Sequence, residues 1–229
     1  MSEDSCPTRP RLWGAAAADG FGRVVDYLRI SVTSQCNERC LYCRPAAGAR
    51  AASLTDELAA EEILRLVRAA AGLGFRKFRL TGGEPLLRTD VADIVGGMSG
   101  IPGVRGIGLS TNGTRLAAQA GALRAAGVRC VNISLDALDP VVYRRITGGD
   151  VTAVLDGIRA ATDVGFERVK LNAVLLRGWN EGELWPLVLF AAEHHLPLRF
   201  IELMPVSCAD AWSKGSFLPV AEVMERLGA

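Results

Sequence analysis

Residues 27–45 read YLRISVTSQCNERCLYCRP. Residues 27–32 are mostly apolar or β-branched and predict a β-strand. Directly after it come Cys36, Cys40 and Cys43, with the spacing C-x3-C-x2-C. An iron–sulfur cube usually takes four thiolates, so three thiolates leave one iron without a protein ligand. An open iron can bind a small molecule, and the stretch therefore predicts a [4Fe–4S] reaction centre at the end of a strand.

A structural zinc site is the alternative for these cysteines. Zinc usually takes four ligands, supplied by paired C-x2-C or C…H groups. The other cysteines, Cys6, Cys130 and Cys208, each stand alone in the sequence, and the two histidines, His194 and His195, are adjacent. Adjacent histidines are poorly spaced for joint chelation. The spacing therefore favours an iron–sulfur site over zinc.

The composition is that of an ordinary soluble protein. The chain has 229 residues, of which 49% are hydrophobic and 22% charged, and its formal net charge is +1. A charge near zero gives no reason to expect nucleic acid as a partner. The longest apolar clusters are too short or too interrupted to cross a membrane, and the first residues lack a signal-type apolar core. We therefore predict a cytoplasmic location, in which cysteines serve metal binding or catalysis rather than disulfides.

Strand-like and helix-like segments alternate along residues 23–229, after a flexible leader predicted over residues 1–22. Strict alternation predicts parallel strands with right-handed crossovers. A closed barrel needs eight such units, so six units predict an α/β fold, a partial, three-quarter (β/α)6 barrel of the TIM type. The first helix is predicted over Glu57–Ala71, with Thr55 as its N-cap. The six strand candidates are Tyr27–Val32, Lys77–Thr81, Gly106–Thr111, Arg129–Leu135, Arg168–Val174 and Leu198–Leu203.

The active site of such a sheet lies at the carboxyl ends of its strands. After the second strand, Gly82 and Gly83 allow a close approach to a ligand, and the Glu84 carboxylate suits an ammonium group. At the end of the fourth strand, Ser134 and Asp136 share one face by the period of two. These two side chains could bond a ribose, or they could form a polar strand end at the surface.

Four cations occupy strand positions: Arg29, Arg79, Lys170 and Arg199. A cation that faces the interior of a barrel is costly unless it is paired with an anion. We therefore predict that at least three of them face the cavity and bind a polyanion such as a triphosphate. The alternative is that some of them point outward between the helices.

Beyond these separate motifs, the whole chain resembles a known family. An aromatic residue, Tyr42, before the last cysteine of C-x3-C-x2-C is typical of radical S-adenosylmethionine (SAM) enzymes. Over Phe21–Ala229 the chain is similar to the GTP 3′,8-cyclase (molybdenum cofactor biosynthesis protein A) family within that superfamily. The resemblance rests on six stretches in family order: LRISVTSQCNERCLYCRP, FRLTGGEPLLRTD, LSTNG, VNISLDALDPVVYRRITGGD, VKLNAVLLRGWNEGEL and LRFIELMPVS.

The resemblance implies a role for each matching residue. It implies that a [4Fe–4S] cluster is held by Cys36, Cys40 and Cys43. Residues matching SAM contacts are Tyr42, Gly83, Glu84, Ser134 and Met204. Residues matching GTP contacts, or lying near the substrate, are Arg29, Arg79, Ser110, Lys170 and Arg199. Ser110 stands where the family usually has threonine and keeps the hydroxyl, whereas Glu38 stands where the family usually has an apolar residue.

The resemblance also implies a lyase reaction, the first step of molybdopterin synthesis. The reduced cluster cleaves SAM, and the resulting 5′-deoxyadenosyl radical takes the 3′ hydrogen of the GTP ribose. The expected partners are GTP or a related nucleotide and an electron donor such as flavodoxin or ferredoxin, and the chain is compatible with a homodimer. No nucleic acid or membrane is expected as a partner.

The family continues with a domain that holds a second cluster and binds the guanine, and we expect this chain to lack that domain. Two other functions therefore stay open. One is a radical SAM enzyme acting on another nucleotide or small substrate, and the other is a non-catalytic remnant. A zinc-binding scaffold is the weakest alternative.

Overall fold

The computed structural model describes residues 18–43, 57–204 and 215–228. Thr55, Cys6, Cys208 and most of the predicted leader lie outside these residues. The strands are β1 (Tyr27–Ser31), β2 (Lys77–Thr81), β3 (Gly106–Thr111), β4 (Val128–Ser134), β5 (Arg168–Leu175) and β6 (Leu198–Glu202). The helices are α1 (Ala60–Gly72), α2 (Val91–Ser99), α3 (Leu116–Ala126), α4 (Pro140–Thr147), α5 (Val151–Asp163), α6 (Leu184–Glu193) and α7 (Val220–Leu227). Two short 3-10 helices are η2 (Pro85–Leu87) and η3 (Glu181–Glu183).

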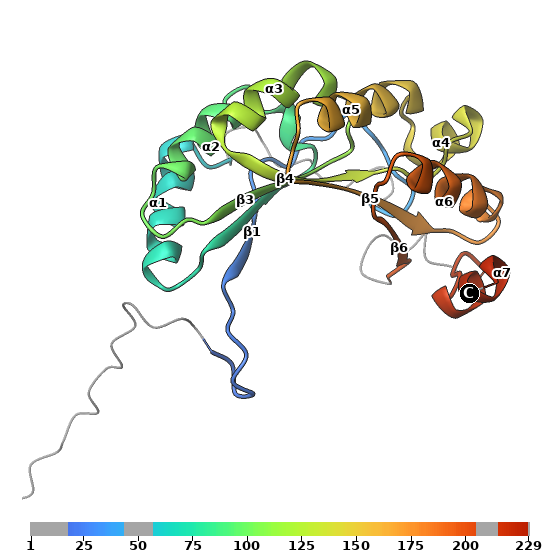
Figure 1. The fold of residues 1–229 in the computed structure, drawn as a ribbon, viewed down its shortest axis with the longest axis horizontal. Coiled ribbons are helices and arrows are strands. Elements are labelled where there is room, and N and C mark those ends of the chain that lie inside the picture. Colours follow the sequence, from blue (N-terminus) through green and yellow to red (C-terminus); the bar gives the residue numbers. More distant parts are fainter. Residues whose placement is uncertain (1–17, 44–56, 205–214, 229) are drawn as a thin grey trace, which may run out of the picture.

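All six strands form one parallel sheet in the order β1-β2-β3-β4-β5-β6. The strands β1 and β6 are its two edges within the described part of the chain, so the sheet is curved but open (Figure 1). The predicted partial barrel is confirmed. No helix of the described residues is both long and apolar enough to cross a membrane.

The two faces of the sheet differ in chemistry because side chains alternate along each strand. Figure 1 shows α1, α2, α3 and α5 covering one face. Apolar side chains such as Ile30, Leu80 and Leu171 point to that face and join the main core. The opposite, concave face carries the polar side chains of the same strands, including Arg79 and Lys170. The fold therefore places the polar strand residues on a single open surface.

One helix escaped the sequence analysis. Helix α4 has a clear start signal, since Asp139 accepts hydrogen bonds from the N–H groups of Val141 and Val142 and Pro140 takes the first helical position. It has only eight residues and lies within a longer loop, so apolar periodicity in the sequence did not indicate a helix there.

The start of α1 also differs from the prediction. The helix begins at Ala60 rather than Glu57, and its N-cap residue is Ala59. Glu57 instead accepts hydrogen bonds from the Thr33 hydroxyl and the Ser34 N–H, both at 2.7 Å. A tertiary contact to the chain after β1 has taken this residue out of the helix.

Candidate functional site

The cysteine loop, residues 32–43, packs against the turn after β2. The N–H of Gly83 donates to the Thr33 carbonyl at 2.7 Å, and the N–H of Glu84 donates to the Gln35 carbonyl at 2.6 Å. A Cβ atom on Gly83 would lie only 2.0 Å from the Gln35 oxygen. Only glycine allows this approach of two backbones. The sequence suggested that Gly83 makes room for a ligand, and in the structure its lack of a side chain also makes room for the cysteine loop.

The end of β3 and the last turn of α4 hold the same loop. Asn112 donates its side-chain N–H to Asn37 Oδ1 at 2.9 Å. The N–H of Arg39 donates to the carbonyl of Thr147, the last residue of α4, at 2.7 Å. The loop is therefore fixed by several elements rather than by its own local structure.

Two tyrosine–carboxylate pairs complete these attachments. Tyr143 donates its hydroxyl to Glu38 at 2.9 Å, and Tyr42 donates its hydroxyl to Asp136 Oδ2 at 2.6 Å. The second oxygen of Asp136 accepts the Val174 N–H at 2.8 Å. Burial raises the pKa of Glu38 to about 7 and the pKa of Asp136 to about 6. Asp136 therefore supports the cysteine loop, and its predicted bond to a ribose stays a prediction.

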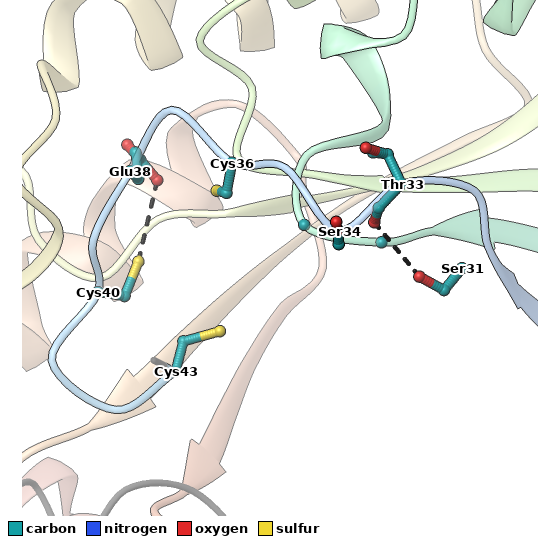
Figure 2. Close-up of a pocket in the computed structure, with 9 residues that line it drawn as sticks. Ser31, Thr33, Ser34, Cys36, Glu38, Cys40 and Cys43 are labelled. Carbon is teal, nitrogen blue, oxygen red and sulfur yellow. Dashed lines mark hydrogen bonds between the residues drawn. The ribbon is translucent and has the colours of Figure 1, made fainter. Parts of the chain in front are cut away.

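The loop curls around a cavity of about 310 Å³, which Cys36, Cys40 and Cys43 all line (Figure 2). A second cavity of about 160 Å³ is also lined by the three cysteines and reaches the ends of β3 and β4. Predicted site residues that line this second cavity are Tyr42, Gly83, Glu84, Ser110 and Ser134. The structure thus brings the strand-end motifs together with the cysteines.

The three thiols suit a cluster better than a single metal ion. In the described part of the chain, no three His, Cys, Asp or Glu side chains are grouped closely enough to hold one ion. The thiolates of a cube bind different irons and stand farther apart than the ligands of one tetrahedral zinc. Burial and neighbouring carboxylates raise the pKa of the Cys40 thiol. A positively charged metal centre would offset that cost of ionisation.

Glu84 is bound within the protein at the border of the second cavity. Its carboxylate accepts hydrogen bonds from the Leu86 N–H at 2.9 Å and from the Thr111 hydroxyl and the Asn112 N–H, both at 2.7 Å. Burial raises its pKa. The carboxylate thereby ties the turn after β2 to the end of β3. Its predicted contact with a ligand ammonium group stays a prediction.

The four predicted cations share the concave face. Strand register pairs Arg29 with Arg79, and the alternation of side chains puts Lys170 and Arg199 on the same side. The guanidinium of Arg79 lies over Gly108, where a Cβ atom would be 2.8 Å from it. Partial desolvation and, after it, nearby arginines lower the pKa of Lys170. No ion pair engages these four cations within the described residues, so the face is suited to an anion.

Two other polar atoms on this face lack a hydrogen-bond partner among the described residues. Ser110 Oγ and Asn172 Oδ1 are buried without a hydrogen bond to any described residue, which is unusual for a folded protein. A ligand on the concave face would satisfy them. The predicted SAM residue Met204 lies beyond the end of β6, is 59% exposed, and is not among the residues that line the two cavities.

Sequence reasoning missed the residues that hold the loop in place. Glu57, Tyr143 and the supporting role of Asp136 depend on contacts between segments 24 to 105 residues apart. Glu38 could be singled out because it departs from the family pattern, but nothing in the sequence indicated that Tyr143 is its partner.

Known proteins show two kinds of similarity to this chain. Residues 30–191 match the radical SAM superfamily. A GTP 3′,8-cyclase from Pelotomaculum thermopropionicum is 46% identical over 92% of the chain and 65% of its own length. A GTP 3′,8-cyclase from Moorella thermoacetica is 47% identical over 91% of the chain and 65% of its own length. The chain therefore spans about two thirds of the length of these relatives.

Solved structures share the fold. Streptococcus suis SuiB bound to S-adenosylmethionine superposes with a TM-score of 0.71 at 17% identity, covering 89% of this chain and 47% of SuiB. Methylornithine synthase (PylB) gives a TM-score of 0.66 at 20% identity, covering 88% of this chain and 60% of PylB.

Proposed function

The chain belongs to the radical SAM superfamily, and we propose that it carries out the SAM-dependent step of a GTP 3′,8-cyclase. Cys36, Cys40 and Cys43 hold the [4Fe–4S] cluster. The observation that carries the proposal is the shared cavity, in which all three thiols meet the ends of β2, β3 and β4. When bound, the cluster and SAM supply a 5′-deoxyadenosyl radical.

The residues around the second cavity bind and orient SAM in this proposal. Tyr42, Gly83, Glu84 and Ser134 line that cavity, and Met204 follows the end of β6. The tyrosine–carboxylate pair of Tyr42 and Asp136 fixes the aromatic ring beside the cysteines. A fixed first layer of contacts keeps a reactive ligand in one geometry, which is what radical chemistry requires.

The concave face binds the nucleotide. Arg29, Arg79, Lys170 and Arg199 supply positive charge for the triphosphate, and Ser110 supplies a hydroxyl next to the SAM region. The chain is 46% and 47% identical to two GTP 3′,8-cyclases over 92% and 91% of its length, which supports GTP as the substrate. Hydrogen abstraction from the ribose then requires the sugar to lie between the cations and the cysteine loop.

The test is SAM cleavage by the reconstituted protein under dithionite, with and without GTP. We expect the wild type to form 5′-deoxyadenosine and Cys40→Ala to form none. Mass spectrometry identifies any cyclised nucleotide. Cleavage that ATP or another small substrate stimulates, but GTP does not, would favour a different radical SAM enzyme. Absence of cleavage in a protein loaded with iron would favour a non-catalytic remnant.

A further inference from the structure

Three arginines lie on the cysteine loop or on the turn of α4 that is hydrogen-bonded to it. Arg39 lies between Cys36 and Cys43 on the loop, and Arg144 and Arg145 lie in the last turn of α4. Backbone hydrogen bonds of 2.7 and 2.9 Å join residues 39 and 41 of the loop to residues 147 and 146 of α4. The two segments therefore lie side by side next to the cysteines.

The three arginine side chains of this surface are exposed. No ion pair of the described residues includes Arg39, Arg144 or Arg145. Arg145 instead stacks over the Trp179 ring, with 4.9 Å between the guanidinium carbon and the ring centroid. The nearby Asp150 uses a carboxylate oxygen to cap α5. The helix dipole stabilises cations at the C-terminal end of α4, which explains why Arg144 and Arg145 lie there. It does not explain Arg39, which lies on a different segment.

An apolar residue lies within the same surface. Leu41 is 37% exposed, between Arg39 and the exposed Cys43. A small apolar centre with a charged surround is common in protein interfaces. We call Arg39, Leu41, Arg144 and Arg145 the basic patch.

We propose that the basic patch is the docking site of an acidic one-electron carrier protein that reduces the cluster. This inference rests on the proposed function, which requires an electron for each SAM cleaved. The carrier loses one electron to the bound cluster, which passes from the 2+ to the 1+ state, and no bond is made or broken. Arg39 and Leu41 of the patch belong to the loop that carries the three cysteines, so a carrier docked there has a short path to the cluster. Interfaces between electron-transfer partners are typically small, and opposite charges steer the association of the partners.

The test compares two double charge reversals that change the net charge equally. Arg39→Glu with Arg144→Glu alters the patch and leaves the Trp179 contact in place. Arg65→Glu with Arg68→Glu lies on α1, at the far end of the molecule from α4 (Figure 1). The probe is a recombinant flavodoxin, used in its hydroquinone form to drive SAM cleavage and in its oxidised form for direct binding at low salt.

In the patch variant, the flavodoxin concentration at half-maximal cleavage and the flavodoxin Kd should both rise roughly tenfold. Cleavage driven by dithionite should stay unchanged, and the α1 variant should behave like wild type. Unchanged flavodoxin binding in the patch variant, or an equal loss in the α1 variant, would overturn the proposal. Failure of dithionite to support any cleavage would count against the proposed function instead, while the binding measurement still decides the docking site.

Discussion

Gly83 has no room for a side chain, because the backbone of the cysteine loop lies against it. Gly83→Ala should push the loop away from β2 and break its two backbone hydrogen bonds, so reconstituted iron should fall well below the wild-type content. Gly96→Ala is the control, since nothing lies within 4 Å of the added Cβ on α2. Equal iron contents in the two variants, measured by metal analysis, would show that this contact does not position the cysteines.

Asp136 predicts a specific pH dependence of stability. Its pKa is raised from 3.8 to about 6, so folding favours the neutral carboxyl. That stabilisation is complete below the unfolded pKa and is lost as the pH rises through about 6. The free energy of unfolding of the cluster-free wild type, minus that of Asp136→Asn, should therefore fall by about 2–3 kcal/mol between pH 4 and pH 7.

Urea denaturation at several pH values measures this difference. Asn at position 136 keeps the size of the side chain and does not titrate, so the comparison isolates the one carboxyl. A difference that does not change with pH would mean that Asp136 is already ionised at low pH in the folded protein.

At the scale of elements, helix α4 supports the site, although none of the predicted site residues lies on it. Its last turn holds the cysteine loop, and Asp139 caps its first turn. Asp139→Ala should lower the free energy of unfolding by about 1 kcal/mol, the usual cost of losing an N-cap. Denaturation of the variant and the wild type measures it, and a change smaller than the error would show that the helix does not depend on this cap.

The strand segments were predicted closely because local composition decides them. The bounds of β2 and β3 agree with the prediction, those of β1, β5 and β6 differ by one residue at one end, and those of β4 differ by one residue at both ends. The predicted start of α1 was wrong because Glu57 accepts hydrogen bonds from Thr33 and Ser34, contacts that no local pattern encodes. The same reason hid the partners of Glu38 and Asp136. Local signals give the elements, whereas long-range hydrogen bonds decide how the cysteine loop is held.

At the scale of the whole molecule, the open sheet presents its cations on the face opposite the helices. This was predictable, since a partial barrel of alternating strands and helices carries its helices on the outer face of the sheet. The partnerless Ser110 and Asn172 atoms were not predictable, because satisfaction of a polar atom depends on all of its neighbours.

The cationic face yields a binding prediction. Lys170→Ala should weaken GTP binding roughly tenfold or more, because it removes a charge-assisted contact from the anion site. Arg159→Ala is the control, on the exposed side of α5 and paired with Asp156. Calorimetry with GTP measures both, and equal affinities would place the triphosphate elsewhere.

The central claim is that the three cysteines hold one cluster whose open iron binds SAM. Electron paramagnetic resonance of the reconstituted, dithionite-reduced protein tests it most directly. We predict the signal of a single reduced [4Fe–4S] cluster that changes shape when SAM is added and is missing in Cys40→Ala. A cluster signal that SAM leaves unchanged, or one that persists in Cys40→Ala, would contradict the account.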